Sequence, residues 1–510
     1  MTRIHDLLRT APADAVGWTA GSRDLRFGEM DAWSDRIAAD FLRRGVRRGD
    51  RIAVNGRTTP EWLAVYFAAA KIGAVVVGLS PRYRETEFAH ILNDSGARLV
   101  VTEPSAGDVD FLALLGKLAL PGVSAATFAE VGTAEPDADA LAAASAAVEK
   151  DDPVMIIYTS GTTGRPKGAT LTHRGQLASA AAEADHLQLS ADDVLPVAVP
   201  LNHVSGITCC ILSALVARSR TVLLPSFDAG AAADLFRTAG LTMWVGVPTM
   251  HTLLLNHERF AGVDTSAIRV VVTGGANAEP ALLQRLTAAF PKATVMNLYG
   301  LSEVSGAVVM TPWNASTEAT ERSIGVPFPG VEAKIASPSG EALSTGETGE
   351  LLFRTPSIMA GYHNLPEETA AAVDADGWLH TGDMARADED GYLTLHGRAK
   401  DMFVQGGFNI YPVEVENVLA AHPGVLLAAG VGVPDPVLGE IGRYYVVPAK
   451  DSAVTEAELK EYCAAQVADY KVPRQIVLRD SLPLTPSGKV QKAALRADET
   501  GREPDERRSP

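Results

Sequence analysis

Tyr158-Thr-Ser-Gly-Thr-Thr-Gly-Arg-Pro-Lys-Gly168 is the stretch from which the rest of the chain can be interpreted. It follows the apolar run Val154-Met-Ile-Ile157, whose length and boundaries predict a buried strand. The loop combines four Ser or Thr hydroxyls, three glycines and two cations. Backbone N–H groups with no Cβ in the way, hydroxyl donors and a cation are the groups that hold a polyphosphate. An ordinary polar turn rarely combines so many of them, so the loop is predicted to bind a nucleotide.

The spacing within the loop differs from that of the common phosphate loop G-x-x-x-x-G-K-[ST]. Gly161 and Gly164 are too close together, and Pro166 precedes the lysine. The loop instead resembles the phosphate loop of the adenylate-forming superfamily, which includes acyl-CoA synthetases, adenylation domains of peptide synthetases and beetle luciferases. The resemblance implies that the nucleotide is held by Thr159, Ser160, Gly161, Thr162, Thr163, Gly164 and Lys167.

Composition limits the class of protein and its partners. At 510 residues the chain exceeds what one hydrophobic core usually serves, so at least two domains are expected. A formal charge of −17 disfavours nucleic acid or an anionic membrane as the main partner. The three cysteines show no metal-ligand spacing, which favours free thiols in a reducing compartment. We expect neither a signal peptide nor an integral membrane segment, and therefore a cytoplasmic protein.

Alternating helix and strand patterns predict the fold class. Residues 25–104 and 151–310 each follow a repeated β-α-β order, which implies parallel sheets covered by helices. Residues 124–150, rich in Ala, Asp and Glu, are expected to form a solvated helix or linker. Residues 321–398 consist of short strands and turns, which predicts a β-rich subdomain. Expected strands include 51–54, 99–101, 154–157, 268–273 and 293–298, and expected helices include 28–44, 62–71 and 280–290.

The predicted architecture is an α/β fold with a large N-terminal domain of parallel β-α-β sheets plus the β-rich subdomain, followed by a small, mobile α+β domain. The resemblance assigns an AMP- and acid-binding domain to residues 1–398 and the small domain to 399–497, with the hinge at Lys400. Residues 498–510 are charged and contain proline, so a disordered tail is expected. The sequence leaves a homodimer open.

A second motif, Tyr299-Gly-Leu-Ser-Glu303, follows a predicted strand and therefore falls at the carboxyl end of a parallel sheet, where ligands collect. The resemblance implies that Tyr299 stacks on adenine, that Ser302 contacts phosphate and that Glu303 helps to hold Mg²⁺. One or two carboxylates together with phosphate oxygens suit Mg²⁺. Further nucleotide contacts are implied at Gly275, Ala276, Gly300, Asp383 and Arg398, the last two reaching the ribose.

Two motifs of the predicted small domain complete the pattern. Pro483-Leu-Thr-Pro-Ser-Gly-Lys489 resembles the segment of the superfamily that carries the adenylation lysine, so Lys489 would bridge the carboxylate and the α-phosphate. A compact ammonium suits that place because negative charge builds on both groups. Gly406-Gly-Phe408 resembles the segment that CoA passes, with Gly407 as its informative position. The implied catalytic residues are Lys489, Lys167 and Glu303, and the implied cofactors and cosubstrates are ATP, Mg²⁺ and CoA.

The resemblance also implies an acid pocket. Its expected lining comprises the stretch 244–250 and His203, Trp244, Gly274 and Leu301. In Pro200-Leu-Asn-His203 the superfamily usually has an aromatic residue where this chain has Asn202, which favours a more polar acid.

The sequence therefore predicts an ATP-dependent, AMP-forming carboxylic acid:CoA ligase, with a small-molecule carboxylic acid, ATP and CoA as its partners. Two other hypotheses keep the adenylation step. A stand-alone adenylating enzyme would load a carrier protein, and an unusual member would activate a non-carboxylate oxyanion such as nitrite. A non-catalytic nucleotide-binding regulator belongs to a different class, and the presence of Lys167, Glu303 and Lys489 argues against it.

Overall fold

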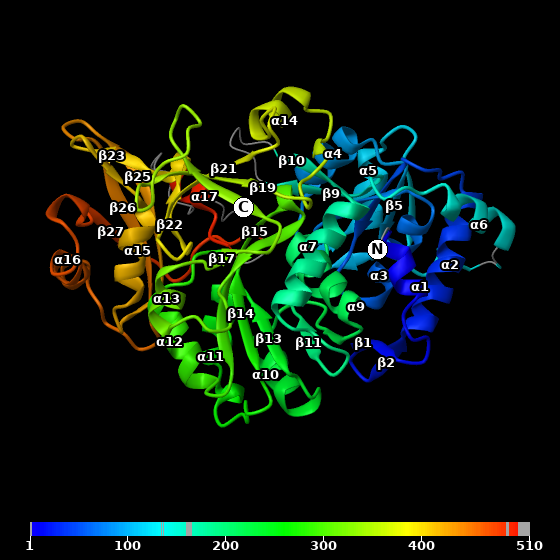
Figure 1. Ribbon diagram of the computed structural model, residues 1–510, viewed down its shortest axis with the longest axis horizontal. Coiled ribbons are helices and arrows are strands. Elements are labelled where there is room, and N and C mark those ends of the chain that lie inside the picture. The colour runs from blue at the N-terminus through cyan, green and yellow to red at the C-terminus, as the bar shows by residue number, and fades with distance from the viewer. Residues whose placement is uncertain (1–2, 134, 136, 160–165, 486–488, 498–510) are drawn as a thin grey trace, which may run out of the picture.

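The computed structural model describes residues 3–133, 135, 137–159, 166–485 and 489–497. They form a large N-terminal α/β domain and a smaller C-terminal domain, which confirms the predicted fold class. In Figure 1 the small domain lies at one end of the molecule, with its helix α15 (Pro412–Ala420) beside α12 (Pro280–Ala289) of the large domain. The expected tail at 498–510 and the middle of the phosphate loop, residues 160–165, lie outside the described residues.

The first sheet of the large domain has seven strands in the order β20-β10-β9-β4-β3-β5-β8. Strands β9, β4, β3, β5 and β8 are parallel, whereas β10 and β20 join antiparallel at one edge. The central strands are apolar and buried on both faces, as expected for a parallel sheet between helices. In the order of the sheet, their bounds are Gly361–Tyr362, Lys167–Thr172, Pro153–Thr159, Val75–Leu79, Arg51–Asn55, Leu99–Thr102 and Ser124–Thr127.

The prediction for 124–150 is wrong at its beginning. Residues 124–127 form the edge strand β8, and Ala126 is buried against the core. Among the described residues of this stretch, only α6 (Ala138–Ala146) is helical. The pattern was misleading because small residues on an edge strand lack the hydrophobic run that marks a central one.

Helices pack on both faces of this sheet, and local signals explain several of their ends. In α3 (Pro60–Lys71), the Thr59 side chain accepts a hydrogen bond from the backbone N–H of Trp62, and Pro60 occupies the first turn. Thr172 caps α7 in the same way. The helices of this region are α1 (Ile4–Arg9), α2 (Phe27–Arg43), α3, α4 (Glu85–Ser95), α5 (Phe111–Leu118), α6 and α7 (His173–His186).

A second sheet, in the order β13-β14-β15-β16-β17, lies at the centre of the chain and is parallel over its first three strands. A four-stranded sheet, β11-β12-β1-β2, flanks it. The strands of the central sheet are Met243–Gly246, Val270–Gly274, Thr294–Leu301, Gly306–Met310 and Val326–Pro327, and those of the flanking sheet are Val194–Val197, Arg220–Leu223, Val16–Ala20 and Arg23–Arg26. Nearby helices are α8 (Val204–Gly206), the π-helix η1 (Ile207–Leu212), α9 (Ser213–Ala217), α10 (Ala229–Thr238), α11 (Pro248–Leu255), α12 and α13 (Thr317–Arg322).

The predicted β-rich subdomain is confirmed as an antiparallel sheet, β18-β19-β21-β22, accompanied by α14. The small domain contains a five-stranded sheet with β24-β23-β26-β25 in order and β27 on β26. The subdomain elements are Glu332–Ala336, Gly349–Arg354, Leu379–Ala387, Leu393–Arg398 and, for α14, Pro366–Ala372. Those of the small domain are β23 (Phe403–Gln405), β24 (Phe408–Ile410), α15, β25 (Val425–Asp435), β26 (Gly439–Pro448), α16 (Glu456–Ala464), β27 (Gln475–Leu478) and α17 (Lys492–Ala497).

None of the helices in the described part of the chain combines the length and the hydropathy that a membrane span requires.

Candidate active site

The two parallel sheets bring their strand ends together around Glu303, which follows β15 in the short helix Ser302–Val304. The backbone N–H of Met359 donates to the carbonyl of Glu303 at 2.8 Å. The same segment then pairs with β10, since the N–H groups of Ala360 and His363 donate to Thr170 and Gly168. Backbone hydrogen bonds therefore join the strand that leaves the phosphate loop to the motif that carries Glu303.

Tyr362, on the two-residue strand β20, connects two of the predicted site residues. Its hydroxyl donates to Glu303 Oε1 at 2.7 Å, and Lys167 Nζ lies 5.4 Å from the centroid of its ring. Burial, followed by the charge of Glu303, raises the pKa of the Tyr362 phenol, so the group stays a hydrogen-bond donor. Tyr362 was not predicted as a site residue, because nothing in its local sequence marks a tyrosine that acts across two sheets.

A second group of side chains lies where β15 meets the β-rich subdomain. Asp383 and Arg398 are directly paired across β21 and β22, and Arg398 Nε lies 3.1 Å from Asp383 Oδ1. The Tyr299 hydroxyl donates to the other oxygen, Oδ2, at 2.5 Å, and the Tyr299 ring packs near Phe353. The structure therefore brings together three residues from two motifs that are more than eighty positions apart in the sequence.

Lys489 comes from the small domain but lies against the large one. Its Cε atom is 3.6 Å from the position that a Cβ on Gly275 would occupy. Burial and the charge of Arg398 lower the pKa of Lys489 to about 8, while Asp383 and Glu303 oppose that shift. Its charge also lowers the pKa of His203, after the larger effect of burial. The charge of Lys489 thus lies within electrostatic reach of Asp383, Glu303 and His203.

The glycines of the predicted site differ in what they require. A Cβ at Gly300 would lie 2.0 Å from the carbonyl oxygen of Gly306, so only glycine allows β15 and β16 to approach so closely. A Cβ at Gly274 would lie 2.6 Å from the carbonyl oxygen of Leu298. Gly275 has φ +78° and is exposed next to Ala276, with Val247 as its other near neighbour. Because these glycines have no side chains, the backbone at the strand ends is uncovered on the side where Lys489 lies.

The segment that begins at His203 forms the other side of the site. His203 caps α8, since its Nδ1 accepts from the backbone N–H of Ser205, and the helix continues directly into the π-helix η1. Asn202 packs against Gly78 at the end of β4, its Cβ 3.0 Å from the position that a Cβ there would take. Single π-helical turns are frequent at functional sites.

Two residues predicted to line the acid pocket, Trp244 and Leu301, do not point toward Lys489 and His203. Trp244 is fully buried on the opposite face of β13, where its Nε1 donates to His251 Nδ1 at 2.9 Å and its ring packs on Phe236. Side chains alternate between the two faces of a strand, so Val245 lies on the face of the sheet opposite to Trp244. Leu301 packs against the core of the β-rich subdomain.

The structure also places the other predicted site residues that it describes. Thr159 ends β9 opposite Lys167, which begins β10. Ser302 is buried at the start of its short helix. Gly407 lies on the β23–β24 turn with φ +87°, and apart from its chain neighbours no atom of the described residues lies within 4 Å of its would-be Cβ. The structure thus brings Lys489, but not Gly407, to the large domain; Ser160, Gly161, Thr162, Thr163 and Gly164 lie outside the described residues.

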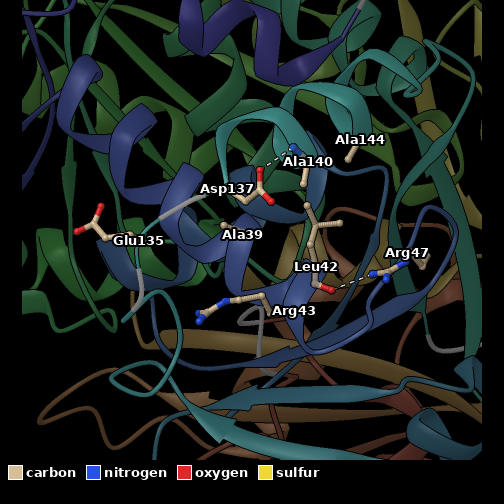
Figure 2. A pocket seen from close by; sticks show the side chains of 8 residues that line it. All are labelled: Ala39, Leu42, Arg43, Arg47, Glu135, Asp137, Ala140 and Ala144. Atoms are coloured by element: carbon tan, nitrogen blue, oxygen red, sulfur yellow. Dashed lines mark hydrogen bonds between the residues drawn. The ribbon is translucent and has the colours of Figure 1, made fainter.

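A surface hollow of about 410 Å³ between α2 and α6 is separate from this group (Figure 2). Its two arginines already have partners, because Arg43 pairs with Asp40 and Arg47 donates to the carbonyl of Leu42. None of the predicted site residues lines it.

Comparison with known proteins agrees with this geometry. The AMP-binding enzyme family matches residues 8–363, and the AMP-binding enzyme C-terminal domain matches residues 414–489. A feruloyl-CoA synthase from Amycolatopsis sp is 36% identical over 479 residues, which cover 93% of this chain and 94% of the relative. The 3-[(3aS,4S,7aS)-7a-methyl-1,5-dioxo-octahydro-1H-inden-4-yl]propanoyl:CoA ligase of Mycobacterium tuberculosis is 36% identical over 514 residues, covering 97% and 99%.

Among solved structures, ATP-bound MatB from Rhodopseudomonas palustris is similar over 98% of this chain and 99% of its own, with a TM-score of 0.86 and 30% identity. The match therefore includes the relative placement of a large and a small domain. The chain belongs to the AMP-binding enzymes of the adenylate-forming superfamily and is an AMP-forming acyl-CoA synthetase.

Proposed function

We propose that this acyl-CoA synthetase activates an acid whose acyl chain carries a largely apolar ring system. The position of Lys489 is the observation that carries the proposal, because this cation packs at Gly275 and lies within electrostatic reach of both Asp383 and His203. Two relatives support the acid class: one is named for feruloyl, an arylpropenoyl group, and the other for a bicyclic propanoyl group.

In the first half-reaction, a carboxylate oxygen attacks the α-phosphorus of ATP and pyrophosphate leaves, giving acyl-AMP. Asp383 and Arg398 are proposed to bind the ribose, Tyr299 the adenine, and Lys167 with the phosphate loop the outgoing phosphates. Lys489 would neutralise the charge that develops between the carboxylate and the α-phosphate. Positioning and charge neutralisation suffice for this step, so no protein nucleophile is assigned.

Glu303 is the proposed ligand of Mg²⁺. One of its carboxylate oxygens accepts from Tyr362, whose ring lies 5.4 Å from the Nζ of Lys167. A single carboxylate completed by phosphate oxygens and water is a donor set that fits Mg²⁺. The ion would shield the phosphate charges, while Tyr362 holds the carboxylate in place.

The second half-reaction is proposed to require a turn of the small domain. We assign residues 1–398 to the large domain and 399–497 to the small one, with the hinge at Lys400 in the turn Ala399–Asp401. Gly407, which does not contact the large domain while Lys489 does, would then approach the site and let the thiol of CoA attack acyl-AMP. Hinge motions of this kind assemble a site in stages.

Two further expectations stay predictions. We propose a cytoplasmic location, and we propose a homodimer, which light scattering on the full chain would test.

The test of the proposed function is pyrophosphate release across a panel of fatty, aromatic, dicarboxylic and amino-substituted acids, followed by detection of the CoA thioester. We expect release with arylpropenoic or ring-bearing propanoic acids, and a thioester only when CoA is added. Release with nitrite alone, or acyl transfer only to a carrier protein, would contradict the proposal.

A further inference from the structure

Helix α4 bonds to the base of the phosphate loop through a side chain that the proposed mechanism does not use. His90, in the middle of α4, is half-buried, and its Nε2 lies 3.0 Å from the carbonyl oxygen of Pro166. A carbonyl oxygen only accepts hydrogen bonds, so Nε2 is the donor. Pro166 directly precedes Lys167, the cation proposed to bind the outgoing phosphates. The bond therefore falls on the peptide group that joins these two residues.

This peptide group sets the direction in which Lys167 leaves the backbone. The carbonyl of Pro166 and the nitrogen of Lys167 lie in one plane, because the peptide bond is planar. A hydrogen bond to that carbonyl resists rotation of the whole plane. On its other side Lys167 begins β10, where it is paired with Thr159 of β9. Lys167 is thus held from both directions, by His90 before it and by the sheet after it.

Helix α4 is itself bound to the strand that enters the phosphate loop. Asp94 lies one turn after His90 on the same face of α4. Its Oδ2 accepts from the Tyr158 hydroxyl at 2.5 Å, and the Tyr158 and His90 rings meet edge to face with their centroids 6.1 Å apart. Burial, followed by the hydrogen bond to Asp94, raises the pKa of the Tyr158 phenol, so it stays a donor. Tyr158 precedes residues 160–165 and Pro166 follows them, so α4 is bonded on both sides of this segment.

A further contact ties α4 to the strand that carries Tyr362. Asn364, two residues after Tyr362, donates from Nδ2 to the backbone carbonyl of Asp94 at 2.9 Å. Tyr362 in turn lies beside Lys167 and donates to Glu303. Helix α4 therefore contacts both the peptide before Lys167 and the segment that holds Glu303, so it can keep the two charged side chains in a constant arrangement.

We propose that His90 is a positioning residue for the adenylation step: its hydrogen bond to the Pro166 carbonyl holds Lys167 at the outgoing phosphates of ATP. The inference rests on the proposed function, since it takes over the role proposed there for Lys167. His90 itself touches neither ATP nor the acid. Its loss should therefore affect only the step in which the outgoing phosphates are present. Acyl-AMP lacks these phosphates, so its reaction with CoA should not depend on His90.

Two substitutions separate the hydrogen bond of His90 from its packing. His90→Phe keeps an aromatic ring beside Tyr158 and removes the donor, whereas His90→Gln keeps an N–H donor and removes the ring. In His90→Phe we expect kcat/KM for ATP in pyrophosphate release to fall about tenfold, because a displaced Lys167 loses part of its charge neutralisation. Thioester formation from preformed acyl-AMP and CoA should stay within about twofold of the parent. His90→Gln should retain most of the adenylation activity.

A double-mutant cycle tests whether His90 acts through Lys167. In a Lys167→Ala background, His90→Phe should cause little further loss of adenylation, because no cation is left to position.

His186→Phe is the matched control. His186 Nε2 lies 2.9 Å from the carbonyl oxygen of Thr311, which follows β16, and its ring packs on Phe328. The substitution removes the same kind of bond between α7 and the end of a different strand. It should lower the Tm without changing the ratio of the two half-reactions.

Calorimetry with ATP and with AMP completes the test and needs no acid. His90→Phe should weaken ATP binding about fivefold and leave AMP binding unchanged, because AMP lacks the phosphates that Lys167 is proposed to contact. The inference would be overturned by equal losses in both half-reactions, by equal losses of ATP and AMP affinity, or by an undiminished effect of His90→Phe in the Lys167→Ala background. Absence of pyrophosphate release with every ring-bearing acid would instead reject the proposed acid class, while the two nucleotide affinities would still decide the role of His90.

Discussion

The residues proposed for the nucleotide site and those proposed for the acid pocket are arranged differently. On the nucleotide side, charged and polar groups stand at strand ends and bind one another: Tyr299 and Arg398 hold Asp383, and Tyr362 holds Glu303. On the proposed acid side, small and apolar residues of η1, β14 and β16 pack together in one hydrophobic cluster. Substitutions in the proposed nucleotide site should lower the activity with every acid by the same factor. Substitutions in the proposed acid pocket should instead change the preference among acids.

The largest expected effect is that of Lys489→Ala. Removal of the ammonium should slow acyl-AMP formation by about 10²–10³-fold, because charge that develops in the transition state loses its partner. The loss should be the same for every acid accepted. Pyrophosphate release measures it.

Thioester formation from preformed acyl-AMP and CoA is the internal control for this variant. It should proceed at close to the parent rate in single-turnover experiments, because Lys489 is proposed to leave the site before CoA reacts. Equal losses in both half-reactions would mean one static site, and the proposed turn about Lys400 would be rejected.

Asp383→Ala should have the next largest effect. It removes a buried carboxylate that aligns Tyr299 and Arg398, and the hydrogen bonds to ribose are charge-assisted. At about 1.5–3 kcal/mol each, their loss should weaken ATP binding by about 10- to 100-fold in calorimetry. Asp390→Ala, an exposed carboxylate in a turn of the same subdomain, is the matched control. Unchanged ATP affinity in Asp383→Ala would remove this residue from the site.

The contrast between the two regions also explains what could be predicted from the sequence. Hydrophobic runs predicted the parallel strands, such as 51–54 and 154–157, because buried strands are nearly continuous in apolar residues. Contiguous motifs predicted Glu303 and Asp383 because polar residues at strand ends are recognisable locally. The structure brings them near Lys167 and Lys489 through sheet pairing and domain packing.

The acid pocket was predicted less well for a physical reason. Trp244 was assigned to it, but strand alternation directs this side chain into the opposite core. Tyr362 was missed because β20 has only two residues and its position depends on pairing with β10.

Tyr362→Phe should have a moderate effect that sharpens the assignment of Glu303. The ring that lies near Lys167 stays, and only the hydrogen bond to Glu303 Oε1 is lost. A loss of roughly 1 kcal/mol, or about fivefold, is expected in the affinity for ATP with Mg²⁺. ATP binding without Mg²⁺ should be nearly unchanged. If both affinities fall together, Tyr362 supports the fold of the site rather than the proposed metal ligand.

The smallest expected effect is a pH dependence that arises at the interface between the large and the small domain, which carries Lys489. Glu279, after the Gly274–Ala276 segment, approaches Glu416 of α15, and Asn277 Nδ2 donates to Asn417 Oδ1 at 2.6 Å across the same interface. Burial, with the charge of Glu416, raises the pKa of Glu279 from an ordinary 4.5 to about 7. Glu416 in turn forms an ion pair with Lys492 at 2.6 Å. Protonated Glu279 therefore favours the arrangement in which the small domain rests on the large one.

This arrangement should weaken as the pH rises, because it binds a proton that the turned arrangement releases. Its advantage is complete below about 4.5 and is lost as the pH rises through about 7. Between pH 5 and 7.5, acyl-AMP formation should decline relative to thioester formation from preformed acyl-AMP by about two- to fivefold, whichever acid is used. Glu279→Gln, which is uncharged at every pH, should remove this decline. An identical pH slope in the two proteins would show that Glu279 does not report on the domain interface, and the pH dependence of adenylation would then have to arise within the nucleotide site.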